Sequence, residues 1–383
     1  MDAKWCKQDK HNQFDCLIDF NDWLDGEEDL AEAKRAELSL DQFSYPSKAL
    51  FAGDKNAYHG VLAEYRIQQM QKALSHTWLT DTCGDLHWYQ KNQSRLIQLL
   101  DLIAKKEVVP FIGAGLSVNG GFPTWKTHLK AQGRTAGLNG AEVDELIDQG
   151  NYEEVIHQIE QQDYLETFEQ ELFDSFIHVN NVPESIMLLG VLFSDTLITT
   201  NYDCLLEHTY QTEFKCDVEV IDNREPNKKP DQKKISVIKL HGDIHSPQSC
   251  IMGKNQYDAA YGVGDIDLSL PLPKLLEFHF TTNSLLFLGC SLNNDRTVET
   301  FKKIKKQARA DAKTLPIHYS IEQAPETEAE ISVRNNELLK MGVAPIWFQP
   351  EQFDTIVDIL KYAQHEMNYR EAMTPPKKEE MTI

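Results

Sequence analysis

The residues of this chain best suited to do chemistry are an asparagine and a histidine, each placed just after an apolar run. Asn201 follows Val191–Thr199, and His241 follows Ser236–Leu240. Both runs are typical of buried strands, so both polar side chains are expected at strand ends. An amide can hold a ribose hydroxyl or orient a water, and an imidazole that titrates near neutrality is a natural general base. The pair therefore predicts a site that deprotonates a hydroxyl or a water.

Two turns of small residues are expected at the same kind of position. The apolar run Val108–Ile112 leads into Gly113-Ala114-Gly115, with Ser117 close behind, and a later run leads into Gly289 and Ser291. Backbone N–H groups of the first turn and the Ser117 hydroxyl can bind a diphosphate, and glycine permits positive φ and close approach of a ligand. The second turn is small enough to admit an adenosine ribose. Together the turns predict a dinucleotide site.

Asp203 has two interpretations. It lies two residues after Asn201, so in strand geometry the two side chains face the same way, and its carboxylate could accept a hydrogen bond from a ligand carboxamide. It could equally be the N-cap of a helix that starts at Cys204. A metal site is not favoured, because His241 and His245 are four residues apart but no third convincing ligand accompanies them.

The runs that carry these residues alternate with segments of helical periodicity. Strands are also predicted at Val218–Asp222, Thr314–Ser320 and Ala344–Phe348, and amphipathic helices at 141–160 and Leu165–Phe176. Such alternation indicates a Rossmann-like, doubly wound α/β fold with a mostly parallel sheet. In these sheets ligands bind beyond the carboxyl ends of the strands, which is where the polar motifs fall.

Composition limits the function classes. Of 383 residues, 60 are acidic and 38 basic, which gives a formal charge of −22. Such a surface repels nucleic acid, so no direct nucleic-acid binding is expected. The basic segment Arg224–Lys234 is interpreted as a solvated loop between two strands. No apolar run reaches the roughly 20 residues that span a bilayer, and the N-terminus has no secretory layout, so no membrane association and a cytoplasmic location are expected.

The chain is expected to have three parts. Residues 1–92 mix aromatic and charged residues with helical periodicity and carry no chemical motif, so they predict a helical region used for packing or oligomer contacts. Residues 93–370 hold the motifs and form the predicted catalytic domain. Residues 371–383 are expected to be a disordered tail, because Pro, Lys and Glu dominate there and cannot bury a core.

Taken in order, four motifs resemble the sirtuin family, the NAD-consuming enzymes named for silent information regulator proteins. They are the Gly113 turn, Thr199–Asp203, Lys239–Asp243 and Phe287–Leu292, within a resemblance that covers about residues 95–362. The resemblance implies that NAD+ is the ligand. It implies that Asn201 and Asp203 contact the nicotinamide ribose and carboxamide, and that His241 is the catalytic base.

A further segment of the resemblance is the loop that lies over the nicotinamide in sirtuins. Gly121–Lys126 stands in its place, so Thr124 and Trp125 are implied to bind the cofactor, with Trp125 as the retained aromatic cover. The aspartate and arginine of the sirtuin loop are absent here, and their roles are not carried over.

The cysteines depart from the sirtuin pattern. Protein-deacylating sirtuins carry two Cys-x-x-Cys pairs that hold a structural zinc, whereas this chain has seven scattered cysteines, no such pair, and only Cys250 and Cys290 after His241. No zinc ribbon and no zinc are therefore expected. In deacylating sirtuins the zinc module shapes the cleft for the acyl-peptide. Because this chain resembles sirtuins at the NAD-cleaving residues but lacks that module, the resemblance favours an NAD+ hydrolase that releases nicotinamide and ADP-ribose. The alternatives are an NAD- or ADP-ribose-binding sensor or scaffold, and a protein deacylase.

The combination of features resembles the sirtuin-like NAD+ hydrolases of bacterial anti-phage defence, in which depletion of NAD+ halts the infected cell. The arrangement of the chain is most similar to the type paired with a HerA-type DNA-translocating ATPase. This resemblance implies a homo-oligomer whose ATPase partner handles DNA.

Overall fold

The structure is a computed structural model that describes residues 12–77, 87–162, 164–225, 228, 230–246, 249–293 and 295–373. The chain divides into two compact units, which we call the helical unit (Met1–His76 and Asp358–Ile383) and the sheet unit (Thr77–Val357). The first division falls 16 residues before the boundary predicted after residue 92. The last helix ends at Met373, inside the predicted tail, and the remainder of that tail lies outside the described residues.

The sheet unit is built on seven strands that all run parallel. Their order across the sheet is β3-β4-β2-β1-β5-β6-β7. This confirms the predicted Rossmann-like α/β fold. The strands are β1 Val108–Ile112, β2 Thr196–Thr199, β3 Val218–Asp222, β4 Ile235–Lys239, β5 Ser284–Leu288, β6 His318–Gln323 and β7 Val343–Phe348.

The central strands are short apolar runs that are buried along their whole length. Every residue of β1, β4, β5 and β7 is buried, as expected for a parallel sheet covered by helices on both faces. Strand β1 lies between β2 and β5, so the other strands that precede β5 in sequence lie on one side of β1, and β5 and the later strands lie on the other. The carboxyl end of β1 is therefore a topological switch point, where such sheets leave a crevice for a ligand.

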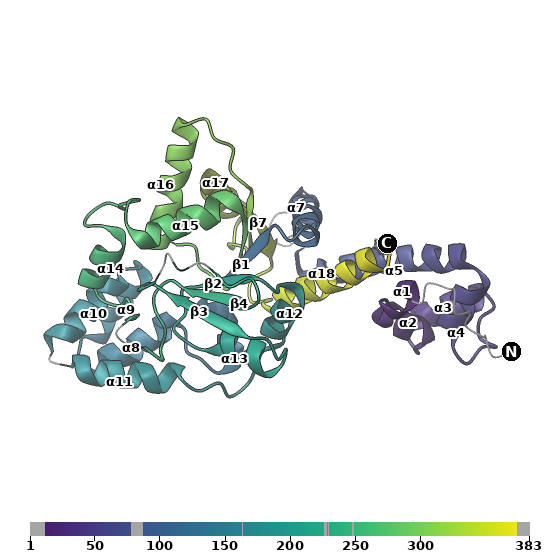
Figure 1. Cartoon of the computed structure of the whole chain (residues 1–383), viewed down its shortest axis with the longest axis horizontal. Helices are drawn as coiled ribbons and strands as arrows, with labels where there is room; N and C mark the ends of the chain where they lie inside the picture. The colour runs from purple at the N-terminus through teal and green to yellow at the C-terminus, as the bar shows by residue number, and fades with distance from the viewer. Residues whose placement is uncertain are drawn as a thin grey trace, which may run out of the picture. The chain divides into compact units, whose positions relative to one another are not determined.

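Within the sheet unit, helices cover the sheet, as Figure 1 shows. Helices α15 and α13 contact β5 and β3, α7 and α17 contact β7, and α8, α9 and α10 pack on one another in a separate layer. The helices of the sheet unit are α7 His87–Ala104, α8 Trp125–Thr135, α9 Gly140–Asp148, α10 Tyr152–Gln161, α11 Leu165–Phe176, α12 Glu184–Leu192, α13 Leu205–Thr212, α14 Lys254–Tyr261, α15 Pro271–Thr282, α16 Arg296–Ala310 and α17 Glu328–Met341, and α18 Asp354–Met373 starts there and ends in the helical unit.

Three predicted segments have different bounds in the structure. The predicted strand Val191–Thr199 is wrong at its start, because Val191 and Leu192 end α12 and β2 begins only at Thr196. The predicted helix 141–160 is two helices, α9 and α10, separated by Gly150, which has a φ of 78° that a continuous helix does not allow. The predicted strand Thr314–Ser320 begins later, at His318, and extends to Gln323.

The helical unit has an aromatic core of its own. Its N-terminal helices are α1 Asn12–Asp15, α2 Ile18–Asp25, α3 Asp29–Glu37, α4 Pro46–Gly53 and α5 Lys55–Ala73. Phe20, Phe51 and Tyr58 are buried there, with ring centroids of Tyr58 5.1 Å from Phe20 and 5.0 Å from Phe51. The C-terminal part of α18 joins this core through Ala372, and Arg66 of α5 pairs with Glu366 of α18 at 2.8 Å.

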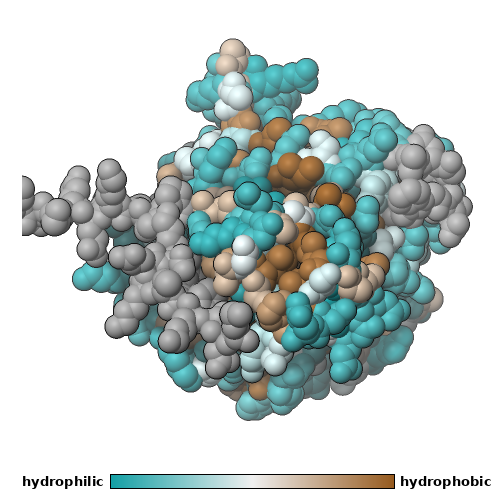
Figure 2. Space-filling view, turned by 90° about the vertical axis from the view of Figure 1, so that its right-hand side faces the viewer, coloured by the Kyte–Doolittle hydropathy of each residue, from teal (hydrophilic) through white to brown (hydrophobic). Residues whose placement is uncertain are grey.

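Some apolar side chains of the helical unit remain exposed. Ile18 is 63% exposed and Tyr45 67% exposed. Figure 2 shows hydrophobic residues gathered among hydrophilic ones on one face of the molecule. Exposed apolar surface of this kind often marks a protein–protein contact. None of the helices in the described ranges is long and apolar enough to cross a membrane.

Candidate active site

A cavity of about 1200 Å³ opens at the carboxyl ends of the central strands of the sheet unit. Ten of the eleven site residues predicted from the sequence line it, namely Gly113, Ala114, Gly115, Thr124, Trp125, Asn201, Asp203, His241, Gly289 and Ser291. They come from segments up to 178 residues apart in the chain. The exception is Ser117, which is 2% exposed and is not part of the cavity wall. A cavity of this size accommodates a dinucleotide.

The sheet topology explains why these segments meet. Each follows the end of a strand: the Gly113 turn follows β1, Asn201 follows β2, His241 follows β4 and Gly289 follows β5. Since these four strands are neighbours in the order β4-β2-β1-β5 and all run the same way, their carboxyl ends form one edge. The cavity therefore lies at the switch point of the sheet.

The two glycine turns pack against each other. A Cβ atom on Gly113 would lie 2.4 Å from the carbonyl oxygen of Gly289, and one on Gly289 would lie 2.5 Å from the amide nitrogen of Leu116. Gly289 has a φ of 66°, but Gly113 has a φ of −105°. Gly113 therefore does not use the positive φ that glycine permits, and it is the close approach of the other turn that requires glycine there.

The same packing uses most of the amides that were expected to bind a diphosphate. The Gly113 amide donates to the Leu288 carbonyl at 2.9 Å, and the Gly115 amide donates to the Gly289 carbonyl at 3.0 Å. Among the described residues, the Ala114 amide has no hydrogen-bond acceptor. Ala114 is thus the position of this turn whose N–H can bind a ligand phosphate.

Asn201 is held by hydrogen bonds from both directions. Its backbone N–H donates to the Thr199 hydroxyl at 2.9 Å, and Thr199 in turn donates to the Ile112 carbonyl of β1. Its side-chain Nδ2 donates to the Ser117 hydroxyl at 3.1 Å. Ser117 therefore fixes the Asn201 amide instead of lining the cavity. The amide oxygen of Asn201 has no donor in the described part of the chain, and it is the atom that can bind a ribose hydroxyl or a water.

His241 is buried beside two tyrosines. Its Nε2 atom lies 2.9 Å from the Tyr261 hydroxyl, which also lies 3.2 Å from the Thr297 hydroxyl, and its Nδ1 atom lies 3.5 Å from the Tyr257 hydroxyl. Burial lowers the pKa of His241 to about 4, so the imidazole is neutral at neutral pH. A neutral ring can accept a proton. Nδ1, with the longer contact, is the nitrogen that a ligand can reach with least rearrangement.

Both tyrosines lie on α14, four residues apart, and therefore on one face of that helix. Arg296, the first residue of α16, holds this helix by pairing with Asp258 of α14 at 2.7 Å and with Glu153 of α10 at 2.9 Å. Sequence reasoning missed both tyrosines. The sequence did carry a signal for them, because two tyrosines spaced four residues apart follow shortly after His241-Gly242.

A third missed residue is Lys239, the last residue of β4, whose side chain is fully buried. Its Nζ atom lies 2.7 Å from a carboxylate oxygen of Glu207 and 3.1 Å from one of Asp243, and it donates to the Asp203 carbonyl at 2.7 Å. Burial by itself lowers the pKa of Lys239, but the negative charges of Glu207 and Asp243 outweigh this effect and raise the pKa above its ordinary value. The lysine therefore stays charged. Lys239 thereby fixes the loop that carries Asn201. A lysine ending an apolar strand was the signal in the sequence.

Asp203 lies one residue before Cys204, the N-cap of α13, so the prediction that Asp203 is the N-cap of a helix starting at Cys204 is wrong by one residue. Its Oδ1 atom accepts a hydrogen bond from the Leu205 amide at 3.1 Å, at the beginning of α13. Burial raises the pKa of this carboxyl, with the charge of Lys239 acting against the rise. Because Asp203 also lines the cavity, a ligand contact through the same carboxyl stays a prediction.

Trp125 and Thr124 begin α8 at the rim of the cavity. Thr124 is the N-cap, and its hydroxyl accepts from the Thr127 amide at 3.1 Å. The Trp125 ring lies 5.3 Å from the Tyr202 ring and is partly buried. A half-covered indole at a cavity wall offers a flat face to an aromatic ligand.

The opposite end of the cavity is organised by an arginine of α17. Arg334 donates to the Ser291 carbonyl at 2.8 Å and pairs with Glu322, at the end of β6, at 3.4 Å. Burial raises the pKa of Glu322, with Arg334 acting against the rise. Ser291 and Glu322 both line the cavity, so this end presents polar groups suited to ribose hydroxyls. No group of three or more His, Cys, Asp or Glu that could hold a metal ion occurs within the described residues.

The fold and the site define a doubly wound α/β protein with a dinucleotide-sized cavity at its switch point. Residues 195–346 of the chain match the family model of the SIR2-like domain. The match runs from the residue before β2 into β7, and it includes Asn201, His241 and the Gly289 turn, whereas β1 and its turn precede it.

The chain is also similar to curated proteins named NAD(+) hydrolase ThsA. The protein from Bacillus cereus (strain MSX-D12) is 25% identical over 244 residues, which is 62% of this chain and 48% of the relative. The protein from Enterococcus faecium is 26% identical over 223 residues, 58% of this chain and 44% of the relative. The chain thus spans less than half the length of these relatives.

Proposed function

We propose that this protein is an NAD+ hydrolase that cleaves the nicotinamide–ribose bond. The observation that carries the proposal is that Asn201 and a neutral His241 line the same cavity as the two glycine turns. The similarity to proteins named NAD(+) hydrolase supports the choice of substrate and reaction. In this arrangement the diphosphate binds near the Ala114 amide, the adenosine ribose near Ser291, and the nicotinamide near Trp125.

The proposed reaction uses water as the nucleophile. The C1′–N bond breaks with its electron pair passing to nicotinamide, which leaves as a neutral molecule, and the ribose passes through an oxocarbenium-like state. The oxygen of a water bonds to C1′, and its proton passes to the neutral imidazole of His241. The amide oxygen of Asn201 holds the water or a ribose hydroxyl. The products are nicotinamide and ADP-ribose.

We infer further that this activity serves bacterial anti-phage defence by depleting NAD+. The support is the resemblance of the motifs to sirtuin-like defence hydrolases and the similarity to the ThsA proteins. A homo-oligomer paired with a HerA-type ATPase is the proposed assembly. The formal charge of −22 agrees with leaving DNA to a partner, and the exposed Ile18 and Tyr45 of the helical unit offer apolar contact surface.

The proposal is tested with purified full-length protein and NAD+, both with and without a candidate ATPase partner. Asn201→Ala should abolish NAD+ loss, because it removes the only side chain proposed to orient the water, while the protein stays folded. Trp125→Ala should slow nicotinamide release less severely. If NAD+ binds but is never consumed under any of these conditions, a sensor or scaffold replaces the hydrolase.

A further inference from the structure

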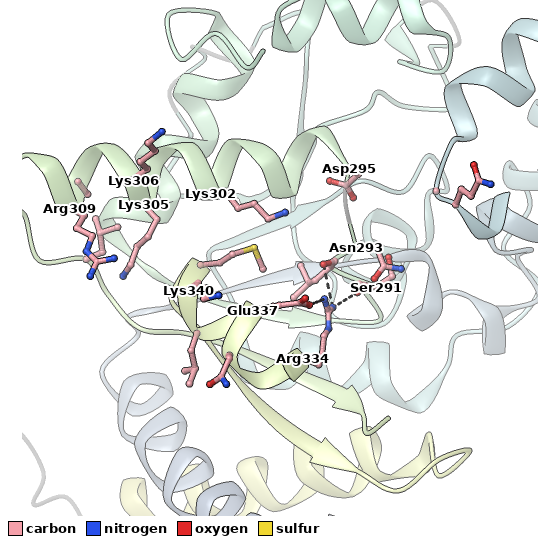
Figure 3. A pocket seen from close by; sticks show the side chains of 18 of the residues that line it. Ser291, Asn293, Asp295, Lys302, Lys305, Lys306, Arg309, Arg334, Glu337 and Lys340 are labelled. Atoms are coloured by element: carbon pink, nitrogen blue, oxygen red, sulfur yellow. Dashed lines mark hydrogen bonds and ion pairs between the residues drawn. The ribbon is translucent and has the colours of Figure 1, made fainter. Parts of the chain in front are cut away.

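A second cavity, of about 1500 Å³, adjoins the dinucleotide cavity and has a basic wall, as Figure 3 shows. It lies between α16 and α17, which pack on each other. Lys302, Lys305, Lys306 and Arg309 of α16 are among its lining residues. In Figure 3 the Lys305 and Arg309 side chains point toward the side of α16 on which Lys340 lies, whereas the Lys306 side chain points the other way. Lys340, in the last turn of α17, adds a further cation. In a chain of net charge −22, this local concentration of positive charge is unusual.

The acidic side chains of this cavity all have partners other than the lysines and the arginine of α16. Asp148 pairs with Lys126 at 2.6 Å, Glu337 lies 3.8 Å from Arg334, and Asp295 accepts from the Val298 amide as the N-cap of α16. Lys302 pairs with Glu299 at 2.8 Å. The three acidic residues of the cavity therefore do not neutralise the other cations of its wall.

Four cations of the wall have no carboxylate within ion-pair distance among the described residues: Lys305, Lys306, Arg309 and Lys340. Arg309 and Lys340 lie in the last turns of their helices, where the negative end of the helix dipole stabilises a positive charge without an ion-pair partner. Helix dipoles do not account for Lys305 and Lys306, which lie in the middle of α16. Lys305 is moreover only half exposed, and like charges three and four residues apart repel each other. An anion with several charges would relieve this repulsion.

We propose that the cavity between α16 and α17 binds a triphosphate group, as carried by a nucleoside triphosphate or an inorganic polyphosphate. Lys305, Arg309 and Lys340 place three unpaired cations toward the roughly four negative charges that a triphosphate bears near neutral pH, and Lys and Arg are the usual phosphate ligands. The cavity is larger than a triphosphate needs, and Leu315, Leu339 and Met341 supply an apolar wall on which a base can pack.

The position of this cavity links it to the dinucleotide site. Arg334 and the segment Ser291–Asn293 line both cavities, and Arg334 holds the Ser291 carbonyl. An anion that attracts Arg334 competes with this contact at the Gly289 turn. Any effect on NAD+ cleavage rests on the proposed function, whereas binding of the triphosphate does not, so binding is the quantity to measure.

The test is calorimetric titration of the full chain with ATP, with tripolyphosphate and with adenosine, in the presence of a chelator. The triple variant Lys305→Ala/Lys306→Ala/Arg309→Ala should bind ATP at least about tenfold more weakly than the unmodified protein. The matched control is Lys228→Ala/Lys233→Ala/Lys234→Ala, which removes the same charge from the loop before β4 and should bind ATP normally. Equal binding of ATP and tripolyphosphate would identify polyphosphate as the ligand, and tighter binding of ATP would identify a nucleotide.

Two results would overturn the proposal. One is ATP binding that the triple variant retains in full, or no binding of either phosphate compound at millimolar concentration. The other is competitive displacement of ATP by NAD+ in a His241→Ala background, which would place ATP in the dinucleotide cavity instead. Neither result depends on whether the protein hydrolyses NAD+, so failure here is distinguishable from failure of the proposed function.

Discussion

The Nε2 atom of His241 lies 2.9 Å from the hydroxyl oxygen of Tyr261, and both side chains are buried. This contact orients the imidazole, because one ring nitrogen is fixed by a partner and the other is left with the 3.5 Å contact to Tyr257. In the proposed reaction the oriented ring receives the proton of water. Tyr261 is therefore a positioning residue.

Tyr261→Phe should lower the rate of NAD+ cleavage by about tenfold, since one hydrogen bond to a buried partner is worth roughly 1–2 kcal/mol. The effect should appear in kcat and not in KM, because Tyr261 does not line the cavity. Tyr257→Phe, which removes a longer contact but does line the cavity, is the comparison and should change kcat less. Equal kcat values for Tyr261→Phe and the unmodified protein would show that the contact has no part in catalysis.

Gly289→Ala should disrupt the site. The residue has a φ of 66°, and its added Cβ would lie 2.5 Å from the Leu116 amide nitrogen, so both the backbone and the neighbouring turn must move. We expect a loss of unfolding free energy of about 1–3 kcal/mol and a loss of nucleotide binding. Thermal unfolding and NAD+ titration measure the two effects.

The control for this substitution is Gly140→Ala. Gly140 starts α9 and has no atom within 4 Å of an added Cβ, so the substitution should leave stability unchanged or raise it by up to about 1 kcal/mol. If both variants behave alike, the close packing of the two turns has no energetic importance.

Lys239→Met should destabilise the sheet unit by about 3–5 kcal/mol, because it leaves Glu207 and Asp243 buried without their partner. Chemical denaturation measures the change. Lys274→Met, at an exposed position on α15, should stay within about 0.5 kcal/mol of the unmodified protein. A stable Lys239→Met protein would mean that the carboxyl groups are protonated or hydrated in the folded state.

Stability should also depend on pH through buried histidines. Burial lowers the pKa of His279 to about 4, below its ordinary value of 6.5, so the unfolded chain takes up a proton first as pH falls. Above pH 6.5 the histidine is neutral in both states and does not lower the free energy of unfolding. Between about pH 6.5 and pH 4 the free energy of unfolding falls as pH falls, by up to about 1.4 kcal/mol per pH unit. In His279→Gln the unfolding free energy should fall less steeply over this range. Parallel curves for the two proteins would contradict the assignment.

Much of the fold could be predicted from the sequence, because the strands of a covered parallel sheet are short apolar runs followed by polar or small residues. The runs that become β1, β3 and β7 illustrate this, and the segments directly after four of the strands give eight of the ten predicted residues that line the cavity. Strand order was not predictable in the same way, since it depends on how distant segments pair.

The remainder of the site depends on contacts that no local pattern encodes. Ser117 was expected to bind the ligand, but its hydroxyl is used by Asn201, 84 residues away. Gly113 and Gly115 were expected to offer amides, but these are bonded to residues 288 and 289. The ends of segments were also uncertain, as at Val191, because apolar helix and strand residues look alike over a few positions.

The central claim is that the chain hydrolyses NAD+ with His241 as the base. The most direct test incubates purified protein with NAD+ and no acyl-peptide, alone and with the candidate ATPase, and quantifies nicotinamide and ADP-ribose against a folded His241→Ala control. The account predicts equal amounts of both products from the unmodified protein and neither from the variant. Equal NAD+ loss in both proteins would contradict the role of His241, and nicotinamide release only when acyl-peptide is added would contradict hydrolysis.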